Sequence, residues 1–380
     1  MVGIGQTKHQ ATNDASIAGV VRQAAERALA DAHMTWADID AVVVGQAPDF
    51  FEGVMMPELY LADALGAVEQ AHVPRAHRRL GRWVDASSPR TSSPAACTSG
   101  CHRRLREAVE SEAMWALSVS LPFQPPMHAG AGGYFAPHIR SYMRRTNAPD
   151  HIGILVALKD RLNALKNPYA HLHEEGITFD SVKDSIMLWD PIRYSETCPS
   201  SDGACAMVLT NEAGGDAAVA DGRSVAWVKG TAFRSEPTMF AGRDQVNPRG
   251  GNDCAADVYQ QAGITDPRRE IDMVEMYVPF SWFEPMWLEN LLFCDVGEGW
   301  KLVEDGVTQM DGDLPVNCSG GVLSSNPIGA SGMLRFAEAA LQVRGMAGEH
   351  QVDGVRTALG HAYGGGSQFF AMWVVGAEKP

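Results

Sequence analysis

Two glycine-rich segments near the C-terminus carry residues suited to binding an anionic or oxyanionic group. The first, Asn317–Gly332, combines closely spaced small residues with two asparagines, and a helix is predicted to follow over Met333–Val343. Glycines let a ligand approach the backbone, and the N–H groups at a helix start favour an anionic or oxyanionic group. Ser331 is predicted to cap this helix. An ordinary loop-to-helix turn is the alternative, and the density of small residues favours binding.

The second segment is His361–Gly366, which we expect between two strands. Its three successive glycines, Gly364, Gly365 and Gly366, exceed what a tight turn needs and leave room for a substrate beside the backbone. His361 is the strongest acid/base candidate in the C-terminal half, because the unperturbed pKa of histidine lies near neutrality. A histidine hydrogen-bonded in the core is the alternative, and the sequence alone favours neither.

A tyrosine ends a predicted strand between these two regions. The strand covers Glu270–Tyr277, and ligands of α/β folds gather at the carboxyl ends of strands. The Tyr277 phenol can donate to a carbonyl or take up a proton. The aromatic residues that follow predict a core cluster, which is compatible with that role: Phe280, Trp282, Phe283 and Trp287.

Two distant stretches repeat one order of elements. Apolar residues at helical spacing predict a helix over Ala15–Ala32, with Asp14 able to cap it, followed by a buried strand over Asp38–Gly45. The same order returns as a helix over Ala255–Ala262 and the strand Glu270–Tyr277. In both copies an acidic-Ile-Asp triplet opens the strand segment, which favours an internal duplication.

A second signal recurs in the same order. A glycine turn runs into an apolar strand at Ser201–Thr210 and again at Gly364–Gly376. We therefore predict an α/β fold with two equivalent halves, residues 1–215 and 222–380, each contributing a sheet packed through helices. The stretch from about 122 to 197 has few strand signals and is interpreted as an insertion that covers the core and shapes substrate access.

The segment Arg75–Arg106 breaks this pattern. It holds eight arginines and one acidic residue, Asp85, where the duplicated architecture requires a buried strand and helix. A basic surface loop and a metal site at Cys97, Cys101 and His102 are alternatives. The preferred hypothesis is a shifted reading frame, because a one-base shift over GC-rich codons restores an apolar strand and a small-residue turn. Resequencing the gene across residues 74–110 tests it.

Charge and composition narrow the function. The net charge of −15 argues against a nucleic-acid partner, and no window resembles a membrane span. The start of the chain lacks a signal-peptide pattern, so we expect a cytoplasmic protein whose seven cysteines are reduced. His171 and His173 are interpreted as a solvated turn, and no metal site or permanently bound cofactor is predicted.

At these motifs the chain resembles the thiolase superfamily, in particular sterol-carrier-type thiolases and the lipid-transfer proteins of actinobacterial steroid side-chain degradation. The matching pieces are Val2–Thr7, Cys198–Ala204, Asn317–Gly332 and His361–Gly366. The resemblance implies a duplicated thiolase fold of five layers, α-β-α-β-α, and a homodimer. It also implies acyl-CoA substrates, with coenzyme A as part of the substrate, and a small OB-fold protein as a candidate partner.

The chain departs from that family at the residues that carry its chemistry. In thiolases the loop before the helix has a histidine where this chain has Asn326, which can donate a hydrogen bond but cannot shuttle a proton. The sterol-carrier type ends the late strand with His-Asp-Cys-Phe, whereas here Tyr277 stands first and Pro279 replaces the cysteine. The family's nucleophilic cysteine belongs to the span that Arg75–Arg106 now occupies.

The resemblance implies a thiolase-like enzyme that forms or cleaves C–C bonds of acyl-CoA thioesters in lipid or steroid side-chain metabolism. A CoA-independent retro-aldolase using Tyr277 is an alternative that needs the fewest catalytic groups, because a proton-exchanging group and an oxyanion pocket suffice. A non-catalytic acyl-CoA or sterol carrier, or a scaffold, is the other alternative. The predicted catalytic residues are Tyr277, His361 and Asn326. The predicted substrate-binding residues are Asn317, Gly320, Gly321, Ser331, Gly364, Gly365 and Gly366.

Overall fold

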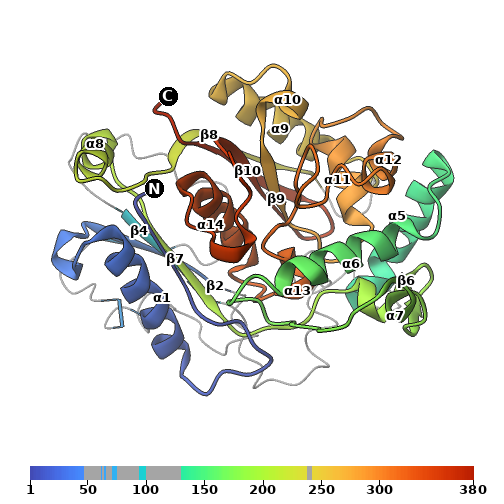
Figure 1. The fold of residues 1–380 in the computed structure, drawn as a ribbon, viewed down its shortest axis with the longest axis horizontal. Coiled ribbons are helices and arrows are strands. Elements are labelled where there is room, and N and C mark those ends of the chain that lie inside the picture. Colours follow the sequence, from blue (N-terminus) through green and yellow to red (C-terminus); the bar gives the residue numbers. More distant parts are fainter. Residues whose placement is uncertain (47–60, 62–63, 66–70, 75–93, 100–129, 238–241) are drawn as a thin grey trace.

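The computed structural model describes residues 1–46, 61, 64–65, 71–74, 94–99, 130–237 and 242–380. Two β-sheets run through these residues, one built from the N-terminal part of the chain and one from the C-terminal part (Figure 1). The predicted α/β architecture with two similar sheets is therefore present.

The N-terminal sheet has five strands. In spatial order they are β1 (Gly3–Gln6), β7 (Ala204–Val208), β4 (Pro94–Ser99), β2 (Ala41–Gln46) and β3 (Ala71–Pro74). The first three pair antiparallel, whereas β2 runs parallel to both β4 and β3.

The C-terminal sheet repeats that order with four strands. They are β8 (Trp227–Ser235), β11 (Phe369–Gly376), β10 (Thr357–Gly364) and β9 (Met273–Met276). Again the first three pair antiparallel and the last pair, β10 with β9, is parallel. Matching spatial order and matching directions are what an internal duplication produces.

Helices form three layers around the two sheets. Helix α1 (Ile17–Ala32) packs on the outer face of the N-terminal sheet, and α9 (Arg249–Ala262) packs on the outer face of the C-terminal one. Between the sheets lies α14 (Ser331–Arg344), whose apolar residues share a core with Ile4 and Met207 on one side and with the C-terminal sheet on the other (Figure 1). The layer order is α-β-α-β-α.

The helix-to-strand repeat is visible in both halves. After α1 come a 3-10 turn, η1 (Trp36–Asp38), and β2; after α9 come the short helix α10 (Pro267–Glu270) and β9. Both long helices end on a left-handed residue, His33 and Gly263.

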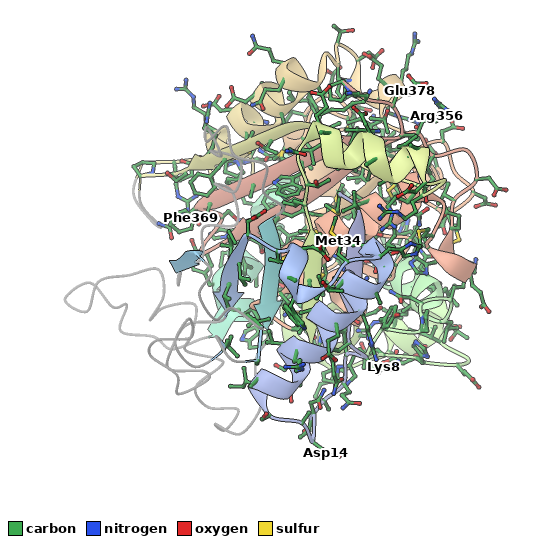
Figure 2. All side chains as sticks on the ribbon, turned by 90° about the vertical axis from the view of Figure 1, so that its left-hand side faces the viewer. Lys8, Asp14, Met34, Arg356, Phe369 and Glu378 are labelled. Atoms are coloured by element: carbon green, nitrogen blue, oxygen red, sulfur yellow. The ribbon has the colours of Figure 1, made fainter. Side chains whose placement is uncertain are left out.

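The start of α1 differs from the sequence-based expectation. Figure 2 shows Asp14 and Met34 at opposite ends of the helix region. Ser16, not Asp14, is the N-cap, because its side chain accepts a hydrogen bond from the Gly19 N–H at 3.2 Å. An oxygen at that position satisfies an otherwise unpaired helix donor.

The predicted insertion contains helices that pack against the C-terminal half. Its elements are α5 (Gly130–Thr146), α6 (Ile152–Ala164), α7 (Phe179–Lys183), β5 (Met187–Trp189), β6 (Ile192–Arg193) and η3 (Tyr194–Glu196). Side chains of α5 and α6 share one core with β9 and α11 (Phe283–Asn290). The remaining elements are α8 (Glu212–Ala220), α12 (Gly299–Glu304), α13 (Gly321–Ser324) and η4 (Gly348–His350). Among the helices of the described ranges, none combines the length and apolar character needed to cross a membrane.

Most of the arginine-rich segment lies outside the described residues. All eight of its arginines do, as do Cys101 and His102. Within it, the backbone of β4 occupies the middle of the N-terminal sheet, so a strand forms where the duplicated pattern requires one. The reading-frame hypothesis stays a prediction for resequencing.

Candidate active site

Tyr277 lies directly after β9, and Asn317 fixes the backbone before it. The Asn317 N–H donates to the Val274 carbonyl at 2.9 Å, and its Oδ1 accepts from the Met276 N–H at 2.8 Å. Asn317 is fully buried with a φ of 54°, a conformation that asparagine tolerates better than most residues. This residue, predicted to bind substrate, holds the end of the strand that carries Tyr277.

The structure brings two of the three predicted catalytic residues together. The Tyr277 hydroxyl donates to Asn326 Oδ1 at 3.2 Å, and the Ser331 hydroxyl donates to the same oxygen at 2.7 Å. Ser331 therefore does not cap α14 as predicted, since the N-cap is Ala330 and the serine side chain turns to the asparagine instead. Tyr277 and Asn326 are each 8% exposed, so this hydrogen-bonded group is almost dry.

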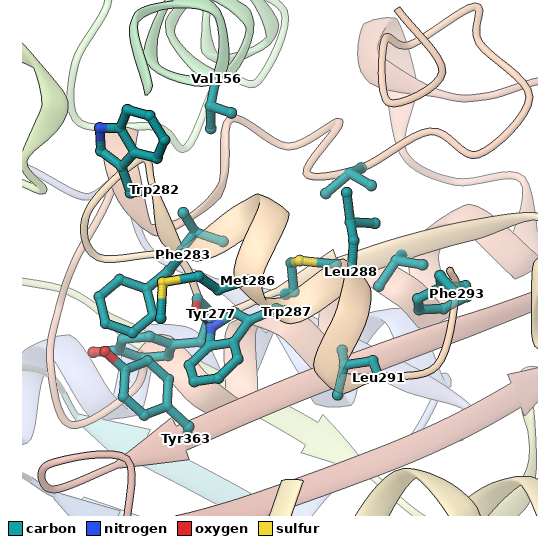
Figure 3. Close-up of a cluster of buried hydrophobic side chains, with 14 of the residues drawn as sticks. Val156, Tyr277, Trp282, Phe283, Met286, Trp287, Leu288, Leu291, Phe293 and Tyr363 are labelled. Carbon is teal, nitrogen blue, oxygen red and sulfur yellow. Dashed lines mark hydrogen bonds between the residues drawn. The ribbon is translucent and has the colours of Figure 1, made fainter. Parts of the chain in front are cut away.

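A second phenol, that of Tyr363, lies beside Tyr277 and was not among the predicted site residues. The rings of Tyr277 and Tyr363 meet edge to face with centroids 5.2 Å apart, and Figure 3 shows both at the same end of the aromatic cluster. Burial raises the pKa of Tyr363 well above its usual range, and Tyr277 and Cys198 nearby add to the rise. Tyr363 therefore stays protonated at neutral pH as a hydrogen-bond donor. The sequence could have indicated Tyr363, because it lies two residues after His361 and alternate residues of a strand share a face.

The segment before β7 supplies the opposite side of Asn326. The Asn326 Nδ2 donates to Cys198 Sγ at 3.2 Å, and the Asn326 backbone N–H donates to Ser201 Oγ at 3.1 Å. Ser201 Oγ also lies 2.8 Å from His171 Nδ1. The predicted solvated turn at His171 is thus tied to the loop that carries Asn326. None of these three contacts was predicted, because they join segments that are distant in sequence.

The predicted glycine positions divide into packed and open ones. Gly320 and Gly321 are buried against α6, where a Cβ on Gly320 would stand 2.6 Å from the Ala164 Cβ. A Cβ on Gly364, by contrast, would meet nothing within 4 Å. Gly364, next to Tyr363, therefore has the open space that was expected beside the glycines.

The turn that contains Gly365 and Gly366 is anchored by an arginine. Arg243 donates from Nη1 to the Ser367 carbonyl at 2.6 Å and from Nη2 to the Gly366 carbonyl. A guanidinium bridging two successive carbonyls fixes the β10–β11 turn. The open space beside Gly364 therefore lies next to a turn whose backbone Arg243 holds in place.

The third predicted catalytic residue, His361, lies inside β10 and not in a loop. Its side chain is fully buried, and neither ring nitrogen has a hydrogen-bond partner among the described residues. Its ring lies against Trp287, Tyr363 and Phe370. Burial lowers its pKa to about 3. A neutral imidazole surrounded by aromatic rings is a core residue, but among the described residues it lacks the hydrogen bond that the alternative interpretation expected.

Replacing His361 with phenylalanine is expected to reduce the acid sensitivity of the fold. The folded-state pKa of about 3 lies below the ordinary value of 6.5, so between these pH values only the unfolded chain takes up the proton. The contribution of neutral His361 is complete above about pH 6.5 and falls as the pH drops toward 3, by up to about 1.4 kcal/mol per pH unit.

Urea denaturation at pH 7 and pH 4.5 measures this difference. The loss of unfolding free energy between the two pH values should be smaller in His361→Phe than in the parent chain. The exposed His173→Phe variant controls for removal of a histidine. An equal loss in parent and His361→Phe would show that His361 is not a buried neutral group.

No group of three or more His, Cys, Asp or Glu side chains in the described part of the chain is placed to hold a metal ion. The polar groups that converge near Tyr277 are instead hydroxyl, amide and thiol groups. Such groups bind and polarise a carbonyl or hydroxyl by hydrogen bonding.

Sequence comparisons place these features among known proteins. Residues 233–377 match the family model described as thiolase C-terminal domain-like. An acetyl-CoA acetyltransferase of Methanothermobacter thermautotrophicus is 27% identical over 376 residues, which cover 96% of each chain. Human sterol carrier protein 2 is 30% identical over 260 residues, which are 67% of this chain but 46% of the human protein. Benzoylsuccinyl-CoA thiolase subunit BbsB of Thauera aromatica is 31% identical and covers 62% of this chain and 60% of its own.

Solved structures share the whole fold. One described as an Ltp2-ChsH2(DUF35) aldolase superposes with a TM-score of 0.81 at 24% identity, covering 99% of this chain and 97% of that one. A monomeric SCP2-thiolase-like protein type 1 from Mycobacterium smegmatis has a TM-score of 0.70 at 17% identity, covering 99% of this chain and 77% of its own. The fold is thus a thiolase-like α/β fold, as predicted, and the chain is similar in sequence to an acetyl-CoA acetyltransferase and to sterol carrier protein 2.

Proposed function

We propose that this thiolase-like chain is an enzyme that acts on acyl-CoA thioesters and cleaves a C–C bond by retro-aldol chemistry. The observation that carries the proposal is the buried hydrogen bond from the Tyr277 hydroxyl to Asn326, beside the second phenol of Tyr363. A phenol can exchange a proton and an amide can polarise a substrate group by hydrogen bonding, but neither can form the thioester intermediate of a thiolase.

The proposed reaction needs few groups. A β-hydroxyacyl thioester loses its hydroxyl proton, the Cα–Cβ bond breaks, and a carbonyl forms at Cβ. The electron pair moves to Cα as a thioester enolate, which then takes up a proton. Tyr277 is the proposed proton-exchanging group, and the protonated Tyr363 hydroxyl is the proposed hydrogen-bond donor to developing negative charge.

The groups next to the site support this chemistry over thiolysis. Asn326 stands where thiolases have histidine, and Pro279 stands where the sterol-carrier type has its acid/base cysteine. The buried Cys318 is no substitute, because burial raises its thiol pKa well above the usual range and leaves it protonated. A thiolate nucleophile is therefore not available from that loop.

The proposed substrate is the CoA thioester of a lipid or steroid side-chain acid. The similarity to sterol carrier protein 2 supports a lipid acyl group, and the similarity to an acetyl-CoA acetyltransferase supports the thioester. A homodimer and a small OB-fold partner remain part of the proposal, and size-exclusion chromatography of the chain alone and with such a partner tests both.

The test is turnover of a panel of β-hydroxyacyl-CoA thioesters, and of the matching β-ketoacyl-CoA thioesters, by the full chain. Release of an aldehyde or ketone without added CoA supports the proposal. Chain shortening of the β-keto compounds that depends on added CoA would show thiolysis instead. Binding without turnover, detected by calorimetry, would identify a carrier and overturn the enzymatic proposal.

A further inference from the structure

Asn326 has a side chain whose two ends do different things. A carboxamide presents one oxygen that accepts and one nitrogen that donates, and a rotation by half a turn exchanges them. Which end faces Tyr277 decides whether the tyrosine hydroxyl donates its proton to Asn326 or accepts one from it. The neighbours that fix this rotation therefore control the state of the phenol.

Two side chains hold the carboxamide in one orientation. On the oxygen side, Ser331 donates to Oδ1 at 2.7 Å, alongside Tyr277 at 3.2 Å. On the nitrogen side, Nδ2 donates to Cys198 Sγ at 3.2 Å. A sulfur close to the amide nitrogen favours the orientation in which the oxygen faces both hydroxyl groups.

The backbone around Cys198 is itself fixed to the strand end that carries Tyr277. The Cys198 N–H donates to the Pro279 carbonyl at 2.9 Å, two residues beyond Tyr277. The neighbouring Thr197 carbonyl accepts from Arg161 Nη2 at 3.1 Å, and Arg161 is buried. Two hydrogen bonds thus fix the backbone that carries the Cys198 thiol beside the candidate site.

We infer that Cys198 is a positioning residue of this site. Its sulfur keeps the Asn326 nitrogen turned away from Tyr277, so that the Asn326 oxygen accepts the phenol proton. In this arrangement the amide oxygen accepts the phenol proton and stabilises the neutral form of Tyr277. Loss of the sulfur lets the amide rotate, and a donor N–H facing Tyr277 stabilises the phenolate instead.

The inference rests on the proposed function for its kinetic readout, and the test compares three variants. Cys198→Ala removes the acceptor, Cys198→Ser keeps one, and Ser331→Ala removes the hold on the opposite end of the amide. Cys294→Ala, a half-buried cysteine between α11 and α12, is the matched control. Thermal melts confirm that each variant is folded before its rate is measured.

The expected result has a distinct pattern. Cys198→Ala should lower kcat about fivefold to tenfold, as expected for one lost hydrogen bond, with KM changed less than about twofold. The apparent pKa of Tyr277 in its pH–rate profile should move to lower pH, because the phenol then ionises more easily. Cys198→Ser should recover most of the rate, Ser331→Ala should show the same direction of shift, and Cys294→Ala should match the parent chain.

Three outcomes overturn the inference. An unchanged pH profile in Cys198→Ala would show that the sulfur does not orient the amide. Equal inactivity of the serine and alanine variants beside a fully active Ser331→Ala would show that the thiol takes part in the chemistry itself. If the parent chain turns over no thioester, the proposed function fails, but ultraviolet titration of the Tyr277 phenolate, read as the difference from Tyr277→Phe, still tests the orientation. A Tyr277 titration unaltered by Cys198→Ala would then be decisive against it.

Discussion

Tyr277→Phe is expected to lower kcat for retro-aldol cleavage by about 10²–10⁴-fold, the range for loss of a positioned proton-transfer group. The substitution removes one oxygen and keeps the ring that packs against Tyr363. KM should change little, because the phenyl ring still fills its place beside Asn326. The measurement is steady-state release of aldehyde or ketone from the best thioester of the panel.

A matched control separates catalysis from packing. Tyr259→Phe also removes a buried hydroxyl, one that donates to the Leu291 carbonyl at 2.8 Å in the contact between α9 and the end of α11. Both variants should lose about 1 kcal/mol of unfolding free energy, the usual worth of one hydrogen bond. Only Tyr277→Phe should lose turnover. Full activity in that variant would remove Tyr277 from the catalytic role.

The fold was predictable because its signals are repeated and local. The helical spacing in α1 and α9 and the acidic-Ile-Asp triplets near β2 and β9 occur twice, and the structure has the equivalent strands at equivalent places in both sheets. Apolar periodicity reports which face of an element is buried, and that information does not depend on distant residues. The order of the five layers was instead implied by the resemblance to thiolases.

The candidate site was predictable only in part. Tyr277 and Asn326 were found because a strand end and a glycine-rich loop are recognisable in sequence, and the structure joins them. Cys198 was missed as a contributor because its contact with Asn326 spans 128 residues. His361 was placed in a loop because the glycines after it suggested one, whereas the strand continues to Gly364.

The buried charges of α6 could not be predicted from the sequence for a different reason. Lys159, Asp160 and Arg161 are consecutive charged residues, a pattern typical of a solvated helix face, yet all three are buried. Lys159 pairs with Glu284 of α11, and Asp160 accepts from Asn317. Arg161 donates to the carbonyls of Ser195 and Thr197, so all three are buried because of tertiary contacts. Local hydrophobicity cannot report charges that are paired across the core.

Lys159→Met is expected to destabilise the chain by about 3–5 kcal/mol, the cost of leaving one partner of a buried ion pair alone. The Lys159 ammonium lies 2.7 and 2.6 Å from the two oxygens of Glu284, and both side chains are at most 1% exposed. Burial by itself lowers the Lys159 pKa, but the Glu284 and Asp160 carboxylates outweigh it and the net pKa is raised. Removing the ammonium leaves the buried Glu284 carboxylate without its cation.

The neighbouring Asp160 makes this loss larger. Asp160 Oδ1 lies 3.4 Å from the Lys159 ammonium, so Lys159→Met also takes the cation away from this second buried carboxyl group, whose pKa burial raises well above its usual range. Asp160 Oδ2 accepts from Asn317 Nδ2 at 3.4 Å. Asn317 in turn holds the backbone before Tyr277, which connects the ion pair to the candidate site. Lys159→Met should therefore lower both the urea midpoint and the turnover at temperatures close to unfolding.

Two further variants decide whether the ion pair itself is responsible. In Lys159→Met/Glu284→Leu both members of the ion pair are apolar, so most of the lost stability should return, as it does when apolar residues replace both members of a buried pair. Lys301→Met breaks a pair with Glu298 of similar length, 2.8 Å, in which both side chains are 47% exposed, and should cost less than about 1 kcal/mol. A loss for Lys159→Met no greater than that of the exposed control would mean that the buried pair contributes only what a surface pair does.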